Sequence, residues 1–300
     1  MSWLALALLS AFVLGIYELL KKLAVRDNAV LPVLFAGVLT GALAWLILRG
    51  LTPLLPTSWQ PGLAVDPLSP REHLAILAKG FLVAASWVCG YAGLKHLPIT
   101  VAGPIRSTAP LWTILLAVAF FDEWPAPAQW LGVLLILVAF FLFSRFGKAE
   151  GIVFHKNRWI YCIVAATALG AISSLYDKYL LQSLDIRVAT LQFWFSIYLV
   201  MAMILPMLWW SRQGRLGTFQ WRWTIPAVGL GLLVADALYF AAIAQEGALI
   251  SVISPVRRTS VIIGFAAGVL FLGERKALGR KIFALALMLA GVAWLQWAGR

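Results

Sequence analysis

Two arginines lie within apolar stretches of this 300-residue chain, at positions where a charge is costly. Arg106 is in "GPIRST" and Arg257 is in "SPVRRT". Ionisable residues inside a membrane usually pair with one another or line a polar path. Two acids match the arginines, Glu18 in "YELLKK" and Asp177 in "YDKYLL". Because arginine forms strong charge-assisted hydrogen bonds with carboxylates, we expect a Glu18–Arg106 pair and an Asp177–Arg257 pair.

Each expected pair lies near one face of the membrane. Glu18 is about one turn inside the end of its helix, and Arg106 is roughly 10 Å from the same face at 1.5 Å per residue. Asp177 and Arg257 have the same relation at the opposite face. We expect each pair to contact substrate or to form a gate when its own face is closed. The alternative is a permanent ion pair, or an anchor that reaches the interface. Adjacent tyrosines belong to the same expected sites: Tyr17 and Tyr176.

A third carboxylate, Asp236, lies about midway along the apolar stretch "GLLVADALYFAAIAQ". No cation in the local sequence neutralises it. Carboxylates at such depth often carry protons or bind cations, so Asp236 is the expected coupling residue, with protons as the coupling ion. The alternative is a carboxyl group that is hydrogen-bonded to a neighbouring helix.

Other polar and aromatic residues are candidates for lining a cavity. Gly170, Ser173 and Asp177 are spaced by three and four, so they share one face of a helix. Several aromatic side chains lie deep in apolar stretches, where they either line a substrate pocket or pack in the core. The possible lining residues are Ser173, Trp87, Tyr91, Trp112 and Tyr239. The GxxxG pairs Gly37/Gly41 and Gly264/Gly268 are more typical of helix packing.

The elements that carry these residues are membrane helices. The chain is 62% hydrophobic and 12% charged, with a mean hydropathy of +0.91, whereas soluble domains carry about 25% charged residues. A membrane-spanning helix needs about 20 apolar residues. Ten windows qualify: 3–20, 30–48, 75–95, 99–121, 127–144, 158–181, 188–210, 225–245, 249–272 and 278–298. We therefore expect an all-α, polytopic membrane protein with ten transmembrane helices. The one long loop, 50–70, is either a surface lid or an inert spacer.

The sequence repeats itself. At an offset of 151, Pro104, Arg106 and Thr108 match Pro255, Arg257 and Thr259, and Phe120 and Glu123 match Phe271 and Glu274. This predicts two five-helix units, 1–150 and 151–300. Because five is odd, the second unit enters the membrane from the opposite face, and the repeats are inverted. Inverted repeats are typical of transporters with a binding site at the repeat interface. The alternative is a duplication that only builds a stable bundle.

Several other functions are not expected. The net charge of +12 is divided among short loops, as in membrane-protein orientation, and does not indicate a nucleic-acid partner. The two cysteines, Cys89 and Cys162, fall within predicted helices and indicate neither a disulfide framework nor a metal site. No HExxH, GxxxxGK[ST], GxSxG or CxxC motif is present. We therefore expect no enzyme activity, no cofactor and no metal, and transport driven by gradients.

The layout resembles that of the EamA-type members of the drug/metabolite transporter superfamily. The resemblance includes "GPIRSTAPLW" and "SPVRRTSVII", and the acidic residue that ends each stretch, in "FFDEW" and "FLGER". It implies a secondary transporter of small organic solutes, often a bacterial exporter, and hence a multi-pass protein of a bacterial inner membrane. It also implies a central cavity lined mainly by the first, third, fourth, sixth, eighth and ninth spans. The residues implied to face this cavity are Glu18, Arg106, Asp177, Asp236 and Arg257.

Carboxylates and arginines together favour a substrate with an anionic group, such as a zwitterionic amino acid. The expected function is therefore secondary export of a small polar metabolite by alternating access. One alternative is an organic-cation or amine carrier, which would use the carboxylates and leave the arginines structural. A membrane-embedded enzyme that acts on a lipid-linked substrate is a further alternative from a different class.

Overall fold

The computed structural model describes residues 2–57, 60–106, 108–109, 111–112, 116, 127–147, 152–212, 219–245, 248, 253, 256–257 and 259–298. These residues form helices and connecting segments, and none of them is in a strand. Among the described residues, six helices are long and apolar enough to cross a membrane. They are α1 (Trp3–Val25), α2 (Val30–Leu51), α4 (Pro70–His96), α8 (Arg158–Lys178), α9 (Val188–Ser211) and α10 (Thr224–Ile243).

Four further helices fall within the other expected spans. They are α5 (Ile99–Arg106), α7 (Gln129–Gly147), α12 (Ser260–Phe271) and α13 (Leu278–Trp297). The fourth and ninth expected spans, 99–121 and 249–272, run partly outside the described residues. Glu123 and Arg258 also lie outside them. The loop 50–70 contains two short helical segments, η1 (Thr52–Leu54) and α3 (Gln60–Leu63). Short segments η3 (Phe154–Lys156) and η4 (Tyr179–Ser183) flank α8.

Local sequence explains where several helices begin. Ser69 and Glu72 form a capping box at the start of α4, and Pro70 occupies its first turn, where a missing N–H costs nothing. Asn157 caps α8 by accepting a hydrogen bond from the backbone N–H of Trp159 at 2.9 Å. Each cap satisfies backbone donors that a helix leaves unpaired at its start.

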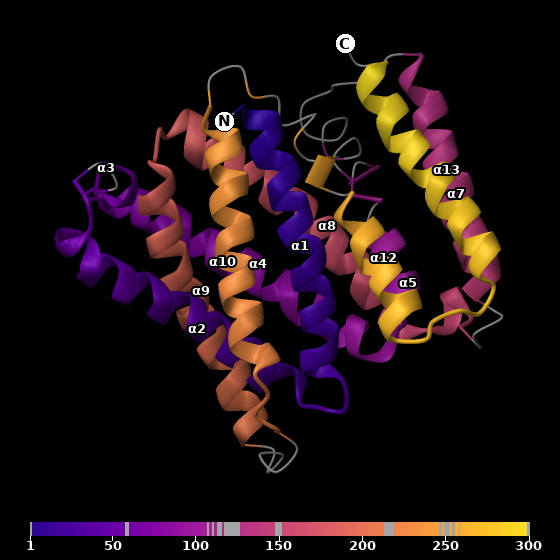
Figure 1. Cartoon of the computed structure of the whole chain (residues 1–300), viewed down its shortest axis with the longest axis horizontal. Coiled ribbons are helices and arrows are strands. Elements are labelled where there is room, and N and C mark those ends of the chain that lie inside the picture. Colours follow the sequence, from indigo (N-terminus) through magenta and orange to yellow (C-terminus); the bar gives the residue numbers. More distant parts are fainter. Residues whose placement is uncertain are drawn as a thin grey trace.

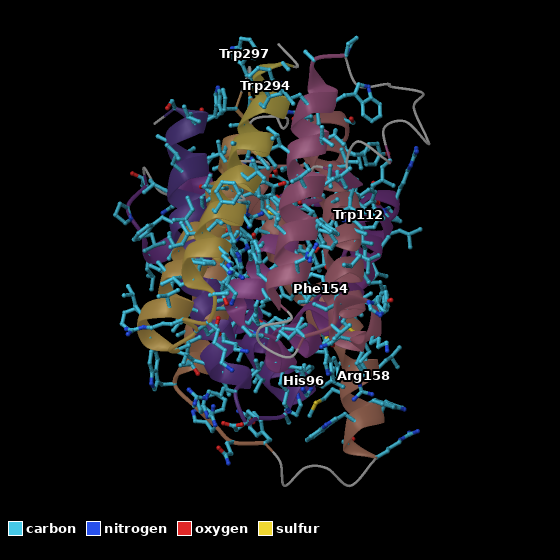
Figure 2. The ribbon with its side chains drawn as sticks, turned by 90° about the vertical axis from the view of Figure 1, so that its right-hand side faces the viewer. His96, Trp112, Phe154, Arg158, Trp294 and Trp297 are labelled. Carbon is cyan, nitrogen blue, oxygen red and sulfur yellow. The ribbon has the colours of Figure 1, made fainter. Side chains whose placement is uncertain are left out.

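The helices pack as one bundle with a distinct edge. Helix α1 packs along α10, and α4 packs along α8. Helices α7 and α13 lie side by side at one edge of the molecule, and α5 and α12 lie between them and α1 (Figure 1). Figure 2 places Trp294 and Trp297 at one end of the bundle, which we call the upper end, and His96 and Arg158 at the other, the lower end.

Helices α1 and α8 run in opposite directions. Helix α1 begins at the upper end, where the N-terminus lies (Figure 1), whereas α8 begins at the lower end with Arg158 (Figure 2). The pairings between halves are also reciprocal: α1 packs on α10 as α8 packs on α4, and α2 packs on α10 as α9 packs on α4. Three further pairs join like elements, α2 with α9, α5 with α12 and α7 with α13.

The expectation that the basic residues belong to loops is wrong for several of them, and three lysines within helices are buried. Lys21, Lys79 and Lys281 lie within α1, α4 and α13, and each is buried. The helices continue through these residues because each ammonium group has a partner inside the bundle: a carboxylate for Lys21 and Lys79, and the Thr100 hydroxyl for Lys281.

Candidate substrate cavity

A polar cavity lies between α1, α4, α5, α8, α9 and α10 in the middle of the bundle. Its lining is unusual for membrane-spanning helices because it is rich in charge. The charged residues that line it are Lys21, Lys79, Arg106, Asp177, Asp236 and Arg257. In a membrane interior such residues are costly unless they are paired, so their gathering on one cavity indicates a functional site.

At the lower part of the cavity, the lining residues Lys21 and Arg106 meet Glu18, which lines a smaller cavity beside it. The Glu18 carboxylate accepts a hydrogen bond from the guanidinium group of Arg106 and is also paired with Lys21, whose Nζ lies 2.6 Å from Oε2. The Glu18–Arg106 pair is therefore present, as expected. Lys21 is an addition that sequence reasoning had assigned to a loop. One carboxylate thus pairs with two cations.

Two tyrosines support this lower cluster. The hydroxyl groups of Tyr17 and Tyr91 lie 3.3 Å apart. The ammonium group of Lys21 lies 4.8 Å from the ring centroid of Tyr17 and 5.2 Å from that of Tyr91. Cations over aromatic faces at such distances are attracted electrostatically. Lys21 is therefore held by one carboxylate and two aromatic faces.

The upper part of the cavity contains two ion pairs, and they differ from the expected one. Asp177 is paired with Lys79, and Arg257 is paired with Asp236. The expected Asp177–Arg257 pair is not formed, because Lys79 on α4 reaches Asp177 where α4 packs along α8. The expectation that Asp236 is unneutralised is also wrong: its partner Arg257 comes from a segment about 20 residues further along the chain, which local sequence does not reveal.

The two upper ion pairs, Lys79–Asp177 and Arg257–Asp236, form what we call the upper cluster. Both of its cations lie against aromatic rings. Lys79 is only 2% exposed, and its Nζ lies 4.6 Å from the ring centroid of Phe195 and 5.3 Å from that of Phe240. The guanidinium carbon of Arg257 lies 4.0 Å from the ring centroid of Tyr239. These contacts fix the positions of both cations at the cavity wall.

The two clusters lie at different depths. Tyr91 of the lower cluster and Lys79 of the upper cluster are both on α4, and their separation along its axis is about 18 Å at 1.5 Å per residue. Together the clusters hold four cations against three carboxylates, Glu18, Asp177 and Asp236. The two clusters together therefore carry one formal positive charge in excess.

The other predicted site residues divide into two groups. Tyr17, Trp87, Tyr91 and Ser173 line the cavity. The ring of Tyr239 faces the guanidinium group of Arg257. The hydroxyl group of Tyr176 donates to the carbonyl oxygen of Ala75 at 3.2 Å, and its ring stacks on that of Tyr179. Trp112 is half-buried and lies at an upper level of the molecule (Figure 2). These last three are not among the described lining residues of the cavity.

Sequence reasoning missed Lys79, although a signal was available. Lys79 lies inside the predicted span 75–95, in "EHLAILAKGFLVAASW", so it is an intramembrane cation by the same criterion as Arg106. Lys21 was harder to find because it lies close to the expected end of its helix. Within the described part of the chain, no group of three or more His, Cys, Asp or Glu side chains could hold a metal ion.

Comparison with known proteins agrees with this architecture. Residues 1–145 match the model of the EamA-like transporter family. The chain is 23% identical over 278 residues to the pseudopaline exporter CntI of Pseudomonas aeruginosa, covering 91% of this chain and 88% of the exporter. It is 42% identical over 86 residues to a probable 4-amino-4-deoxy-L-arabinose-phosphoundecaprenol flippase subunit, ArnF, of Aeromonas hydrophila, covering 28% of this chain and 58% of the subunit.

A solved crystal structure shares the fold over 98% of both chains, with a TM-score of 0.59 and 17% sequence identity. At that identity the likeness concerns the fold alone. The resemblance to EamA-type transporters is confirmed by the family model over the first half of the chain. The protein is thus a multi-pass membrane protein, and its residues 1–145 match the EamA-like transporter family.

Proposed function

We propose that this protein is a secondary active transporter that exports a small polar organic metabolite carrying an anionic group, for example an amino acid. The observation that carries this proposal is the central cavity, which is lined by four cations and two carboxylates, with a third carboxylate, Glu18, paired to two of those cations. An excess of one positive charge favours a solute with at least one anionic group. The carboxylates offer partners for an ammonium group on the same solute. The exporter relative supports export as the direction.

Alternating access between two inverted repeats, 1–150 and 151–300, is the proposed mechanism. The opposite directions of α1 and α8 and the reciprocal helix pairings support it. In this proposal the Glu18–Arg106 pair closes the lower end, and Asp177 and Arg257 are held by Lys79 and Asp236 instead of by each other. Opening the lower end would separate Glu18 from Arg106.

Asp236 remains the proposed coupling residue, now acting through Arg257. Protonation of Asp236 would free the guanidinium group of Arg257 for substrate. The other charged groups near this pair are Asp177 and Lys79. Replacing Asp236 with Asn should remove the pH dependence of transport, and an unchanged pH profile in that variant would exclude Asp236 as the proton site.

A binding experiment tests the substrate class. The purified full-length protein is heated with amino acids, with their carboxamides, which lack the anionic group, and with tetramethylammonium. A ligand that binds only the folded state raises the unfolding temperature. Amino acids should do so, and carboxamides should not. Arg106→Gln should remove the effect, whereas Glu72→Gln, at an exposed helix cap outside the cavity, should retain it.

Two other outcomes would change the substrate class. Stabilisation by tetramethylammonium and by carboxamides, with no effect from the carboxylate, would indicate an amine carrier. The match to the flippase subunit favours a second candidate, movement of a lipid-linked substrate. Stabilisation by a polyprenyl phosphate alone would support it. Chemical turnover of such a lipid in detergent, without any gradient, would indicate an enzyme.

A further inference from the structure

The acidic residue that follows α12, Glu274, lies over the start of another helix. Its Oε1 accepts a hydrogen bond from the backbone N–H of Ile99 at 3.1 Å, and its Oε2 accepts one from that of Thr100 at 2.9 Å. These are the first two residues of α5. Helix starts leave such N–H groups unpaired and carry a partial positive charge, so a carboxylate stabilises them. Glu274 therefore caps a helix to which it does not belong.

The backbone conformation after α12 places the Glu274 carboxylate at the start of α5. Gly273, with φ of +68°, adopts the left-handed conformation that glycine tolerates without strain. The turn brings the backbone N–H of Glu274 to the carbonyl oxygen of Gly268, at 3.0 Å. A Cβ atom at Gly268 would lie 2.9 Å from Oε2 of Glu274 and 3.0 Å from Cγ2 of Thr100. Only glycine leaves room there for the cap.

A second contact, between α13 and the start of α5, reinforces the cap. Lys281, at the start of α13, is fully buried, and its Nζ donates to Oγ1 of Thr100 at 2.9 Å. Thr100 is thus held through its backbone by Glu274 and through its hydroxyl group by Lys281. Both contacts join the second half of the chain to the first, at the lower end of the bundle.

The capped helix also carries the proposed gate. Helix α5 has eight residues, with the cap of Glu274 at its first turn and Arg106 at its last position. Arg106 is paired with Glu18 of α1. A displacement of α5 as one body that takes Arg106 away from Glu18 also breaks the contacts at the start of α5.

We propose that Glu274 is a latch for the lower end of the transporter. Its carboxylate holds the start of α5 against the end of α12, which keeps Arg106 in position beside Glu18, and it releases α5 when this end opens. Glu274 is thus a positioning residue that acts through α5 and does not touch substrate. This inference rests on the proposed alternating-access function, but it concerns residues outside the central cavity.

The test measures opening directly and needs no substrate. Cys89 and Cys162 are replaced by Ala, and Ala102 of α5 is replaced by Cys. Ala102 is 0% exposed and lines a small cavity between α1, α5 and α12. A polar maleimide should label this cysteine slowly when Glu274 is present. Gly279→Cys, at an exposed position of α13 with no atom near its side chain, should be labelled rapidly in every background.

Glu274→Ala should raise the rate of labelling at position 102 by about tenfold or more, which corresponds to roughly 1.4 kcal/mol of lost stabilisation of the closed end. Glu274→Gln retains the length and one acceptor oxygen, so it should be intermediate. The matched control is Glu72→Ala, which removes a carboxylate that caps its own helix α4 and should leave labelling at position 102 slow.

The outcomes separate the latch from the proposed function. Unchanged labelling in folded Glu274→Ala protein, as judged by size-exclusion chromatography, would overturn the latch even if transport is demonstrated. If Glu274→Ala protein does not fold, the labelling rate of Glu274→Gln decides, and no increase in it would also overturn the latch. Faster labelling in a protein that moves no solute would support the latch as a conformational contact and contradict transport.

Discussion

Buried charge is the dominant feature at the scale of single residues. Glu18 pairs with both Lys21 and Arg106, whereas Asp177 and Asp236 each have one bonded cation among the described residues. Removing one partner of a buried pair leaves an uncompensated charge, which costs about 3 to 5 kcal/mol. The three carboxylates should therefore respond differently to mutation.

Glu18→Gln should destabilise the protein more than Lys21→Met or Arg106→Gln. The first change leaves two buried cations without a carboxylate, whereas each of the others leaves Glu18 with one cation. Thermal unfolding of the three variants in the same detergent checks this order. Equal losses of stability would show that Lys21 does not share the charge of Glu18.

Lys79→Met should lower the free energy of unfolding by about 3 to 5 kcal/mol, because Asp177 then remains buried without its cation. The double variant Lys79→Met/Asp177→Leu should recover most of this loss, since no unpaired charge is left. The exposed pair of Arg187 and Asp66 is a matched control, and Arg187→Met should cost about 1 kcal/mol or less. A double variant no more stable than Lys79→Met would contradict a direct pair.

At this scale the sequence predicted which charged residues lie inside the bundle better than which of them form pairs. Glu18, Arg106, Asp177, Asp236 and Arg257 were found because a charge inside an apolar stretch is visible without a structure. Their partners were not, except for Glu18 and Arg106. Pairing depends on how α4, α8 and α10 are rotated about their axes, and no local pattern records that rotation.

At the scale of elements, close helix contacts depend on glycine. Gly37 and Gly41 of α2 face α10, and the contact is tightest at Gly229. A Cβ atom added at Gly229 would overlap the backbone of Gly37 and would lie 3.0 Å from Cβ of Thr40. The GxxxG pattern on α2 predicted a packing face, but it could not show that the glycine under most constraint is on the partner helix.

Gly229→Ala should therefore destabilise the protein by about 1 to 3 kcal/mol through overpacking. Gly41→Ala is the control, because its Cβ would lie at an ordinary 3.6 Å from the nearest atom of α10, and it should be nearly neutral. Unfolding temperatures of the two variants test the difference. A larger loss for Gly41→Ala would mean that α2 and α10 pack differently.

The extent of the helices was predicted with limited precision. The first was expected over 3–20 but continues to Val25, since Lys22 donates to the carbonyl oxygens of Leu94 and Leu97 at 2.7 and 2.6 Å. A window of apolar residues ends at the first charged residue. A helix can continue past that residue when its charged side chain finds hydrogen-bond acceptors, as Lys22 does. The same error placed Lys21 in a loop.

At the scale of the whole molecule, the helix pairings between the two halves are reciprocal, whereas the ion pairs are not. Helices pair reciprocally between residues 1–150 and 151–300. Glu18 meets Arg106, but its repeat counterpart Asp177 meets Lys79 instead of Arg257. In an alternating-access transporter such a difference is expected, because only one end is closed at a time.

The most direct test of this account is counterflow in sealed proteoliposomes. Vesicles that contain the protein are loaded with an amino acid identified in the binding experiment and are diluted into a trace of the same labelled amino acid. The account predicts transient accumulation of label above equilibrium. Accumulation should be lost in Arg106→Gln and retained in Glu72→Gln. Label that binds to the protein but never enters the vesicles would contradict transport.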